Sequence, residues 1–124
     1  MTSEFVHLHN HSDYSLLDGA QRVDQLVDTI DDLNMDSLAL TEHGNMFSVV
    51  PFYNQAKNTG IKPIIGCETY VAVGSRHNKK PPAGGGWGNN HLILLVQNQS
   101  GYQNLMKLVT AGYLEGFYYR PRID

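Results

Sequence analysis

The sequence predicts an α/β domain with mostly parallel strands and helices packed outside them. Short apolar segments rich in β-branched residues alternate with segments whose apolar residues recur at helical spacing, and this alternation is typical of parallel sheets and barrels. The chain has 124 residues, whereas a closed α/β barrel typically needs ~250. We therefore expect one domain with an open sheet, whose apolar edges would favour self-association.

The first half of the chain contains two expected strands and two expected helices. A strand at Phe5–His9 precedes an amphipathic helix with apolar residues at Val23, Leu26, Val27, Ile30 and Leu33. A short strand at Ser37–Thr41 follows. The second helix has Pro51 near its first turn and Gly60 as its terminator, and its apolar residues are Phe52, Tyr53 and Ala56.

The second half begins with a long β-rich run, Ile61–Val73, which Pro63 and Gly66 are expected to interrupt. A strong apolar strand at His91–Gln97 and a third helix at Gly101–Tyr113 complete the predicted elements.

A polar loop is expected over Gly74–Asn90. Three successive glycines predict flexibility, and the loop contains neither a P-loop nor a dinucleotide-binding fingerprint. We favour a solvated surface loop, in which His77 is exposed and not a ligand. The alternative is a lid that touches an anionic substrate through Arg76, His77, Lys79, Lys80 and Trp87.

The composition excludes several classes of function. A net charge of −3 with neutral histidine gives no broad basic surface for nucleic acid, although a local patch or a metal cluster could engage phosphate. The single cysteine, Cys67, excludes an internal disulfide and fits a reducing compartment. No apolar run approaches ~20 residues, and Met1–Glu4 shows no secretory signal, so we expect a cytoplasmic protein without membrane contact.

The pair His9 and His11 directly follows the first expected strand. Side chains two apart on a strand point the same way, so both imidazoles can hold one metal ion. Asp18 adds a carboxylate. Histidine and carboxylate without a thiolate favour Zn, Mn or Fe, although an isolated histidine would be read as an ordinary strand residue.

Three further candidates lie near other strands. His43 follows the second strand, at the end where loops of α/β folds carry their sites. Glu68 is an acid among apolar residues, so it should be paired or metal-bound. Its neighbour Cys67 should point to the opposite face, into the core. His91 begins an apolar strand and by itself would be an ordinary strand-edge histidine.

Five strings, in the same order, resemble the amino-terminal part of the PHP (polymerase and histidinol phosphatase) domain of the bacterial DNA polymerase III alpha subunits. They cover residues 5–11, 14–20, 40–45, 60–68 and 116–122, so the resemblance extends over essentially the whole chain. It implies the amino-terminal half of a distorted PHP-type (β/α) barrel, with 1–124 as a partial PHP domain.

The resemblance also implies a trinuclear metal cluster at the carboxyl ends of the strands. The matching ligands are His9, His11, Asp18, His43, Glu68 and His91. Catalysis would rest on His9, His11 and Glu68, with Glu68 bridging two ions. PHP domains with a full ligand set resemble metal-dependent 3′–5′ exonucleases that remove mispaired primer ends, whereas those that have lost ligands act as scaffolds.

Two departures from the family pattern qualify this expectation. Glu42 stands where the family most often has Asp, and we expect it to orient His43 or a neighbouring ligand from outside the cluster. The family's last ligands, a Cys or His and an Asp-x-His pair, lie beyond the equivalent of Asp124. By itself the chain is therefore expected to bind metal incompletely and to have little exonuclease activity.

Three functions remain open at this point. The first is part of a replicative DNA polymerase, which acts on the DNA primer end together with the remaining polymerase domains and replisome subunits. The second is a non-catalytic structural or docking module of that polymerase. The third is a free-standing histidinol-phosphatase-like phosphoesterase, which the strings at Tyr14–Ala20 and Gly116–Arg122 disfavour.

Overall fold

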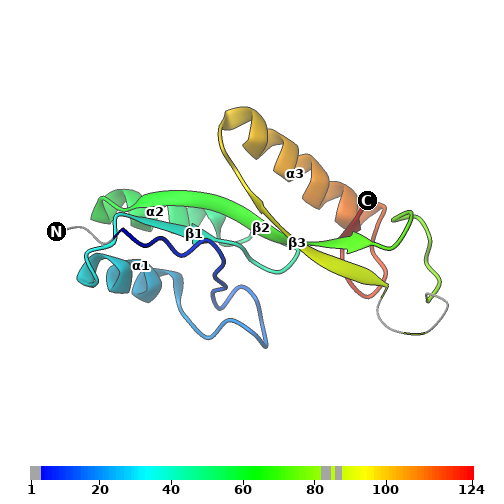
Figure 1. Cartoon of the computed structure of the whole chain (residues 1–124), viewed down its shortest axis with the longest axis horizontal. Coiled ribbons are helices and arrows are strands. Elements are labelled where there is room, and N and C mark those ends of the chain that lie inside the picture. Colours follow the sequence, from blue (N-terminus) through cyan, green and yellow to red (C-terminus); the bar gives the residue numbers. More distant parts are fainter. Residues whose placement is uncertain (1–3, 82–84, 86–87) are drawn as a thin grey trace.

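A computed structural model describes residues 4–81, 85 and 88–124 of the chain (Figure 1). The elements are α1 (Val23–Asp32), β1 (Ser37–Leu40), α2 (Val49–Thr59), β2 (Lys62–Ala72), β3 (Asn89–Leu95), α3 (Gln99–Leu114) and β4 (Arg122–Ile123). The α/β class is confirmed, and the three predicted helices occur within a few residues of their expected bounds. None of the helices in the described ranges is long and apolar enough to cross a membrane.

The long strand β2 organises the whole sheet, and Figure 1 shows it running through the length of the molecule. Its first part pairs in parallel with β1, from Ser37 opposite Lys62 to Leu40 opposite Ile65. Its second part pairs with β3 on one edge and with β4 on another. The expected interruptions at Pro63 and Gly66 are wrong, because β2 is continuous through both residues. Pairing with β3 begins only at Gly66, so the missing N–H of Pro63 removes no bond to that strand.

The sheet is mixed, which differs in one strand from the expected parallel arrangement. β1 and β4 are parallel to β2, whereas β3 is antiparallel to it. A parallel neighbour needs a crossover connection, usually a helix. The described residues between β2 and β3 contain no helix, so the chain returns alongside the strand it has just left.

The expected first strand at 5–9 is wrong as a regular element. The segment follows β1 with a single parallel bridge between His7 and Leu38, and with bonds from Ala39 N–H to the His7 carbonyl and from Thr41 N–H to the Asn10 carbonyl, both 2.9 Å. The Asn10 side chain also donates to the Ala39 carbonyl. Hydrogen bonds from side chains thus replace part of a regular backbone ladder. They hold the amino-terminal segment beside the edge of β1.

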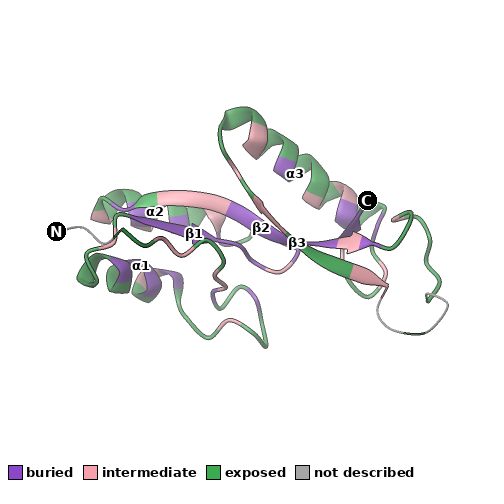
Figure 2. Cartoon of the chain, viewed as in Figure 1, coloured by how far each residue is buried: buried purple, intermediate pink, exposed green. Residues whose placement is uncertain are grey.

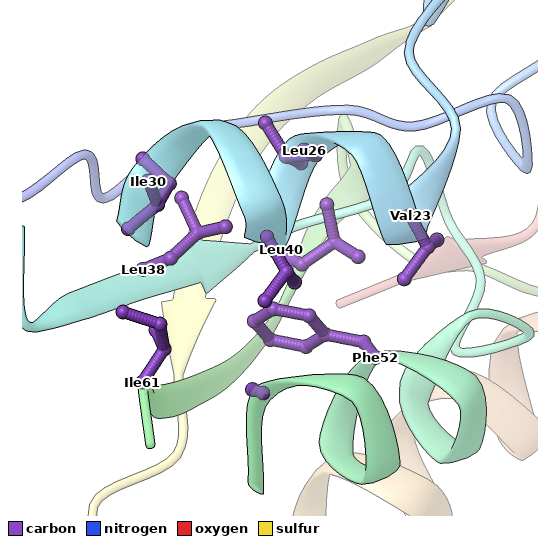
Figure 3. Close-up of a cluster of buried hydrophobic side chains, with 9 residues drawn as sticks. Val23, Leu26, Ile30, Leu38, Leu40, Phe52 and Ile61 are labelled. Carbon is purple, nitrogen blue, oxygen red and sulfur yellow. The ribbon is translucent and has the colours of Figure 1, made fainter. Parts of the chain in front are cut away.

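The main core lies between α1, α2 and the strands β1 and β2 (Figure 3). Four of the five expected apolar residues of this helix point into it, whereas Leu33 does not, because α1 ends at Asp32 and Leu33 is exposed. Its buried members are Val23, Leu26, Val27, Ile30, Leu38, Leu40, Phe52, Ala56 and Ile61. Figure 2 shows that α3 is largely exposed by comparison; Leu105 and Gly112 are its buried residues. This core therefore supports the end of β1, directly before Glu42 and His43.

The loop after β2 is attached to the carboxyl-terminal segment through Arg122. This buried guanidinium donates to the carbonyls of Gly116, Arg76 and Asn78. Arg76 in turn pairs with Glu115 and Asp124. The two-residue strand β4, which the sequence did not predict, is held by these contacts and by its pairing with β2.

The lid alternative finds no support in the described part of this loop. Arg76 and Lys79 bind the carboxyl-terminal segment, through Glu115 and the backbone carbonyls that follow α3. His77 is exposed, as expected. Trp87 and two of the three successive glycines lie outside the described residues, so the flexibility of 74–90 stays a prediction.

We expect Gly60→Ala to lower the free energy of unfolding by about 1 kcal/mol. Gly60 ends α2 with a φ of 82°, in the left-handed region, and its added Cβ would meet no atom within 4 Å, so the cost comes from the backbone alone. Gly101→Ala is the matched control, because Gly101 lies inside α3 with ordinary contacts for a Cβ, and this change should be neutral or stabilising. Urea denaturation measures both, and equal midpoints for the two variants would contradict the assignment.

Candidate metal centre

The six sequence-predicted ligands come together at one place in the structure. They form three overlapping groups whose ligand atoms lie within 4.8 Å of one another: His9, His11 and Glu68; His11, Asp18 and His43; and His43, Glu68 and His91. They come from the amino-terminal segment, the loop after it, the residues after β1, and the strands β2 and β3. Side chains from five separate parts of the chain thus share a single locus.

The sheet explains this convergence. The amino-terminal segment and β1 run parallel to β2, so His9, His11 and His43 leave the sheet in the same direction. A further parallel bridge joins His43 to Glu68. In the antiparallel ladder His91 lies opposite Tyr70, which follows Glu68 by two positions and therefore shares its face.

Glu68 is the centre of the cluster. Its side chain is only 5% exposed, and its Oε2 lies 2.5 Å from His9 Nε2, 3.0 Å from His11 Nε2 and 3.6 Å from His43 Nδ1. Its Oε1 contacts His91 Nδ1. Burial raises the pKa of Glu68, but hydrogen bonds with His9 and His91 outweigh burial and hold that pKa below its usual value. The two oxygens of one ionised carboxyl group therefore face different histidines, as a bridging ligand requires.

The groups around Glu68 also favour metal-binding forms. Burial and the nearby His43 lower the pKa of His11, so its ring stays neutral to a lower pH than a free imidazole. The hydrogen bond with His43 lowers the pKa of Asp18. Neutral imidazoles and ionised carboxylates are the forms that bind divalent metals.

The environment of one buried nitrogen in this cluster shows whether a cation would fit there. His43 Nδ1 is buried and has no hydrogen-bond partner in the described part of the chain, although its ring contacts Asp18 through Nε2. A buried polar nitrogen without a partner is costly unless something binds it. With Nε2 bonded to Asp18, the Nδ1 lone pair faces Glu68, and a divalent ion among these donors would satisfy it. The residues present therefore fit a metal.

Glu42 lies beside the cluster and not in it. Its fully buried carboxylate accepts bonds from the hydroxyls of Ser12, Ser15 and Ser48 and from the Ser12 N–H at 3.1 Å. It does not contact the His43 ring. Sequence reasoning missed the three serines. The two within the first motif lay close enough to the histidines to be considered, whereas no local signal marks Ser48.

Cys67 occupies the opposite face of β2, as expected. It is fully buried, and its thiol donates to the Glu42 carbonyl. Burial raises the pKa of the Cys67 thiol to about 12, so it is neither a nucleophile nor a ready ligand at neutral pH.

A cleft of about 730 Å³ opens beside His43 and His91. Aromatic rings line much of it, and Tyr70 stacks on His43 with 17° between the ring planes. The Arg120 guanidinium lies 5.8 Å from the centroid of the Tyr70 ring. The cleft thus brings three of the candidate ligands, Asp18, His43 and His91, together with aromatic surfaces and the Arg120 cation.

Comparison with known proteins agrees with this geometry. Residues 7–124 match the family model described as the PHP domain. The chain belongs to the PHP domain family. It is 54% identical over 122 residues to the DNA polymerase III subunit alpha of Borreliella burgdorferi, which covers 98% of this chain and 10% of that protein. It is 45% identical over 128 residues to the Aquifex aeolicus subunit, covering 100% of this chain and 11% of that one.

Two solved structures share the fold of this PHP domain chain. One is an amidohydrolase from Chromobacterium violaceum, with a TM-score of 0.56 and 22% identity, covering 86% of this chain and 34% of that one. The other is a proposed metal-dependent phosphoesterase from Bifidobacterium adolescentis, with a TM-score of 0.56 and 14% identity, covering 91% and 36%. The chain spans about a tenth of the length of the curated polymerase relatives.

Proposed function

We propose that this PHP domain chain forms the amino-terminal half of a metal-dependent phosphoesterase site in a bacterial replicative DNA polymerase, where the complete site removes mispaired primer ends in the 3′–5′ direction. The observation that carries the proposal is the convergence of four histidines and two carboxylates on one locus, with Glu68 at its centre. The high identity to polymerase alpha subunits supports the assignment to that protein, with DNA-directed DNA synthesis as the activity of the whole.

The ligand roles follow from the contacts. His9 and His11 would hold one divalent ion with Glu68 Oε2. His91 would hold another with Glu68 Oε1, and His43 would hold one together with Asp18. Zn, Mn and Fe suit this donor set, which has no thiolate. Bound divalent ions supply a nucleophile at neutral pH and neutralise charge on a phosphodiester. The protein's part is to keep these donors neutral or ionised as required and to fix their positions.

The cleft beside the cluster suits the end of a DNA strand. Bases stack on aromatic side chains with little sequence preference, and the rings of Tyr70, Tyr113 and Phe117 line the wall next to His43. Arg120 would pair with a phosphate. The net charge of the chain is −3, so the positive charge of Arg120 does not belong to a broad basic surface. Other polymerase domains would therefore supply the remaining electrostatic attraction for DNA.

A docking role is the second candidate, and the surface of α3 favours it. Two apolar hollows, of about 400 and 420 Å³, lie along α3 and share Met106, Thr110 and Leu114. A docked protein would remove this apolar surface from water. It suits the remaining polymerase domains and replisome subunits, or a second copy of the chain. No observation favours a free-standing histidinol-phosphatase-like enzyme.

We expect a full-length alpha subunit that contains this segment to degrade a mismatched, labelled primer from its 3′ end when Mn²⁺ or Zn²⁺ is supplied. The double variant His9→Ala, His11→Ala should lose this degradation, because one ion loses two ligands, and should keep primer extension. The 124-residue chain by itself should show little activity.

His77→Ala is the control, since this exposed histidine lies outside the cluster and its loss should change neither activity. If the double variant degrades the primer as fast as the parent protein, the cluster is not an exonuclease site. The docking role would then be the better account.

A further inference from the structure

The three serines around Glu42 form a buried polar network directly beneath the metal-ligand cluster. Glu42, Ser12, Ser15 and Ser48 are all buried, and the carboxylate accepts four hydrogen bonds from them. The bond from the Ser48 hydroxyl measures 3.0 Å. A buried carboxylate needs this many partners to offset the loss of water. The network is therefore rigid, and any ligand attached to it is held in place.

Ser15 is the member of this network that reaches the cluster. Its hydroxyl proton is donated to Glu42 Oε2. Its oxygen then accepts the backbone N–H of His43 at 3.0 Å and faces His11 Nδ1 at 3.4 Å. Since the single hydroxyl proton is already used, the contact with His11 can only be a bond that Nδ1–H donates.

With a metal ion bound at Nε2, this arrangement fits one tautomer of His11. A proton on Nδ1 leaves the lone pair on Nε2, and Nε2 is the atom that faces Glu68 Oε2 at 3.0 Å and His9 Nε2 at 2.9 Å. Metal-bound histidines generally donate their other N–H to an acceptor that sets the tautomer and the ring orientation. Ser15 Oγ is that acceptor for His11.

The backbone of Ser15 reaches a third candidate ligand. Its carbonyl accepts the N–H of Asp18 at 3.1 Å and that of Gly19 at 2.8 Å. The turn is so tight that a Cβ on Gly19 would lie 1.8 Å from the Ser12 carbonyl oxygen. One residue thus contacts His11, His43 and Asp18, which together form one of the three ligand groups.

We propose that Ser15, anchored by Glu42, is a positioning residue of the metal site: its hydroxyl sets the His11 tautomer and holds the His43 backbone. The proposal rests on the metal-binding role of the cluster proposed above. It also gives Glu42 a specific task. A carboxylate in this position acts on the ligands through serine hydroxyls and not by touching the His43 ring.

The test compares Ser15→Ala with Ser48→Ala in the 124-residue chain. Both remove one hydroxyl from Glu42, but only Ser15 touches ligands. In the metal-free protein, Ser15→Ala should speed hydrogen exchange of the His43 amide about tenfold, as the loss of one hydrogen bond predicts, and Ser48→Ala should not. Zinc affinity, measured by competition with a chromophoric chelator, should fall about 10- to 100-fold in Ser15→Ala only.

Ser15→Thr keeps the hydroxyl and should recover most of both properties, which a defect in folding would not. Wild-type zinc affinity and wild-type His43 exchange in Ser15→Ala would overturn the proposal, as would equal losses in Ser48→Ala. Because the exchange measurement needs no metal, it separates the two proposals. If neither the parent chain nor a full-length subunit that contains it binds zinc, yet His43 exchange depends on Ser15, the metal-binding proposal fails and the positioning contact stands.

Discussion

Glu68→Gln should weaken zinc or manganese binding by about 100-fold or more. The substitution keeps the shape of the side chain but replaces the carboxylate that we propose to bridge two ions with an amide, one end of which carries hydrogens. Removal even of a group that only orients a ligand commonly costs 10- to 100-fold in metal affinity, and Glu68 contacts four of the candidate ligands directly. Chelator competition on the purified chain, followed by counting of bound metal, measures the loss.

Glu115→Gln is the matched control. Glu115 lies on the surface and pairs with Arg76, away from the cluster, so its charge can be removed without touching a ligand. Its variant should bind metal like the parent chain. An unchanged affinity in Glu68→Gln would show that Glu68 is a paired core carboxylate and not a ligand, and would remove the centre of the proposed site.

Phe52→Ala should lower the free energy of unfolding by about 3–5 kcal/mol. Phe52 has no exposed surface, and its side chain points from α2 toward α1 and β1 (Figure 3). Its loss would leave a cavity among aliphatic side chains. Domains of this size have total stabilities of ~5–15 kcal/mol, so the variant would lose a large share of its stability. Urea denaturation followed by circular dichroism gives the shift.

Tyr53→Ala provides the comparison on the same helix. Tyr53 is the next residue along α2 and is 48% exposed, so its replacement should change stability by only about 0.5 kcal/mol. If the two variants unfolded at the same urea concentration, the core would not be centred on Phe52. The inference that this core holds β1 in place, and with it Glu42 and His43, would then also be wrong.

Local sequence patterns predicted much of the fold. The spacing of Val23, Leu26, Val27 and Ile30 predicted α1 and its buried face, because helical periodicity depends only on neighbouring residues. Gly60 marked the end of α2 for the same reason. The expected strand at 5–9 pairs with β1 through a single backbone bridge at His7, and the contact continues through the Asn10 and Thr41 side chains, which no periodicity reports.

The candidate site also has features that the sequence predicted and contacts that only the structure gives. The residue types His, Asp and Glu, and the two-residue spacing of His9 and His11, identified metal chemistry from the sequence. The resemblance to PHP domains supplied the rest of the ligand set. Neither gave the individual contacts of Glu68 with the four histidines or the direction of β3, because those contacts join residues separated by as many as 59 positions.

By itself the sequence determined the α/β class, the helix positions, the chemical nature of the site and the family, since each depends on residue identity and local spacing. Only the tertiary structure decided that Glu68 contacts four of the expected ligands directly, that β3 runs antiparallel, and that Glu42 accepts hydrogen bonds from Ser12, Ser15 and Ser48. The physical reason is that hydrogen bonds between distant segments are set by how the strands pack. A buried carboxylate takes whatever donors that packing brings within reach.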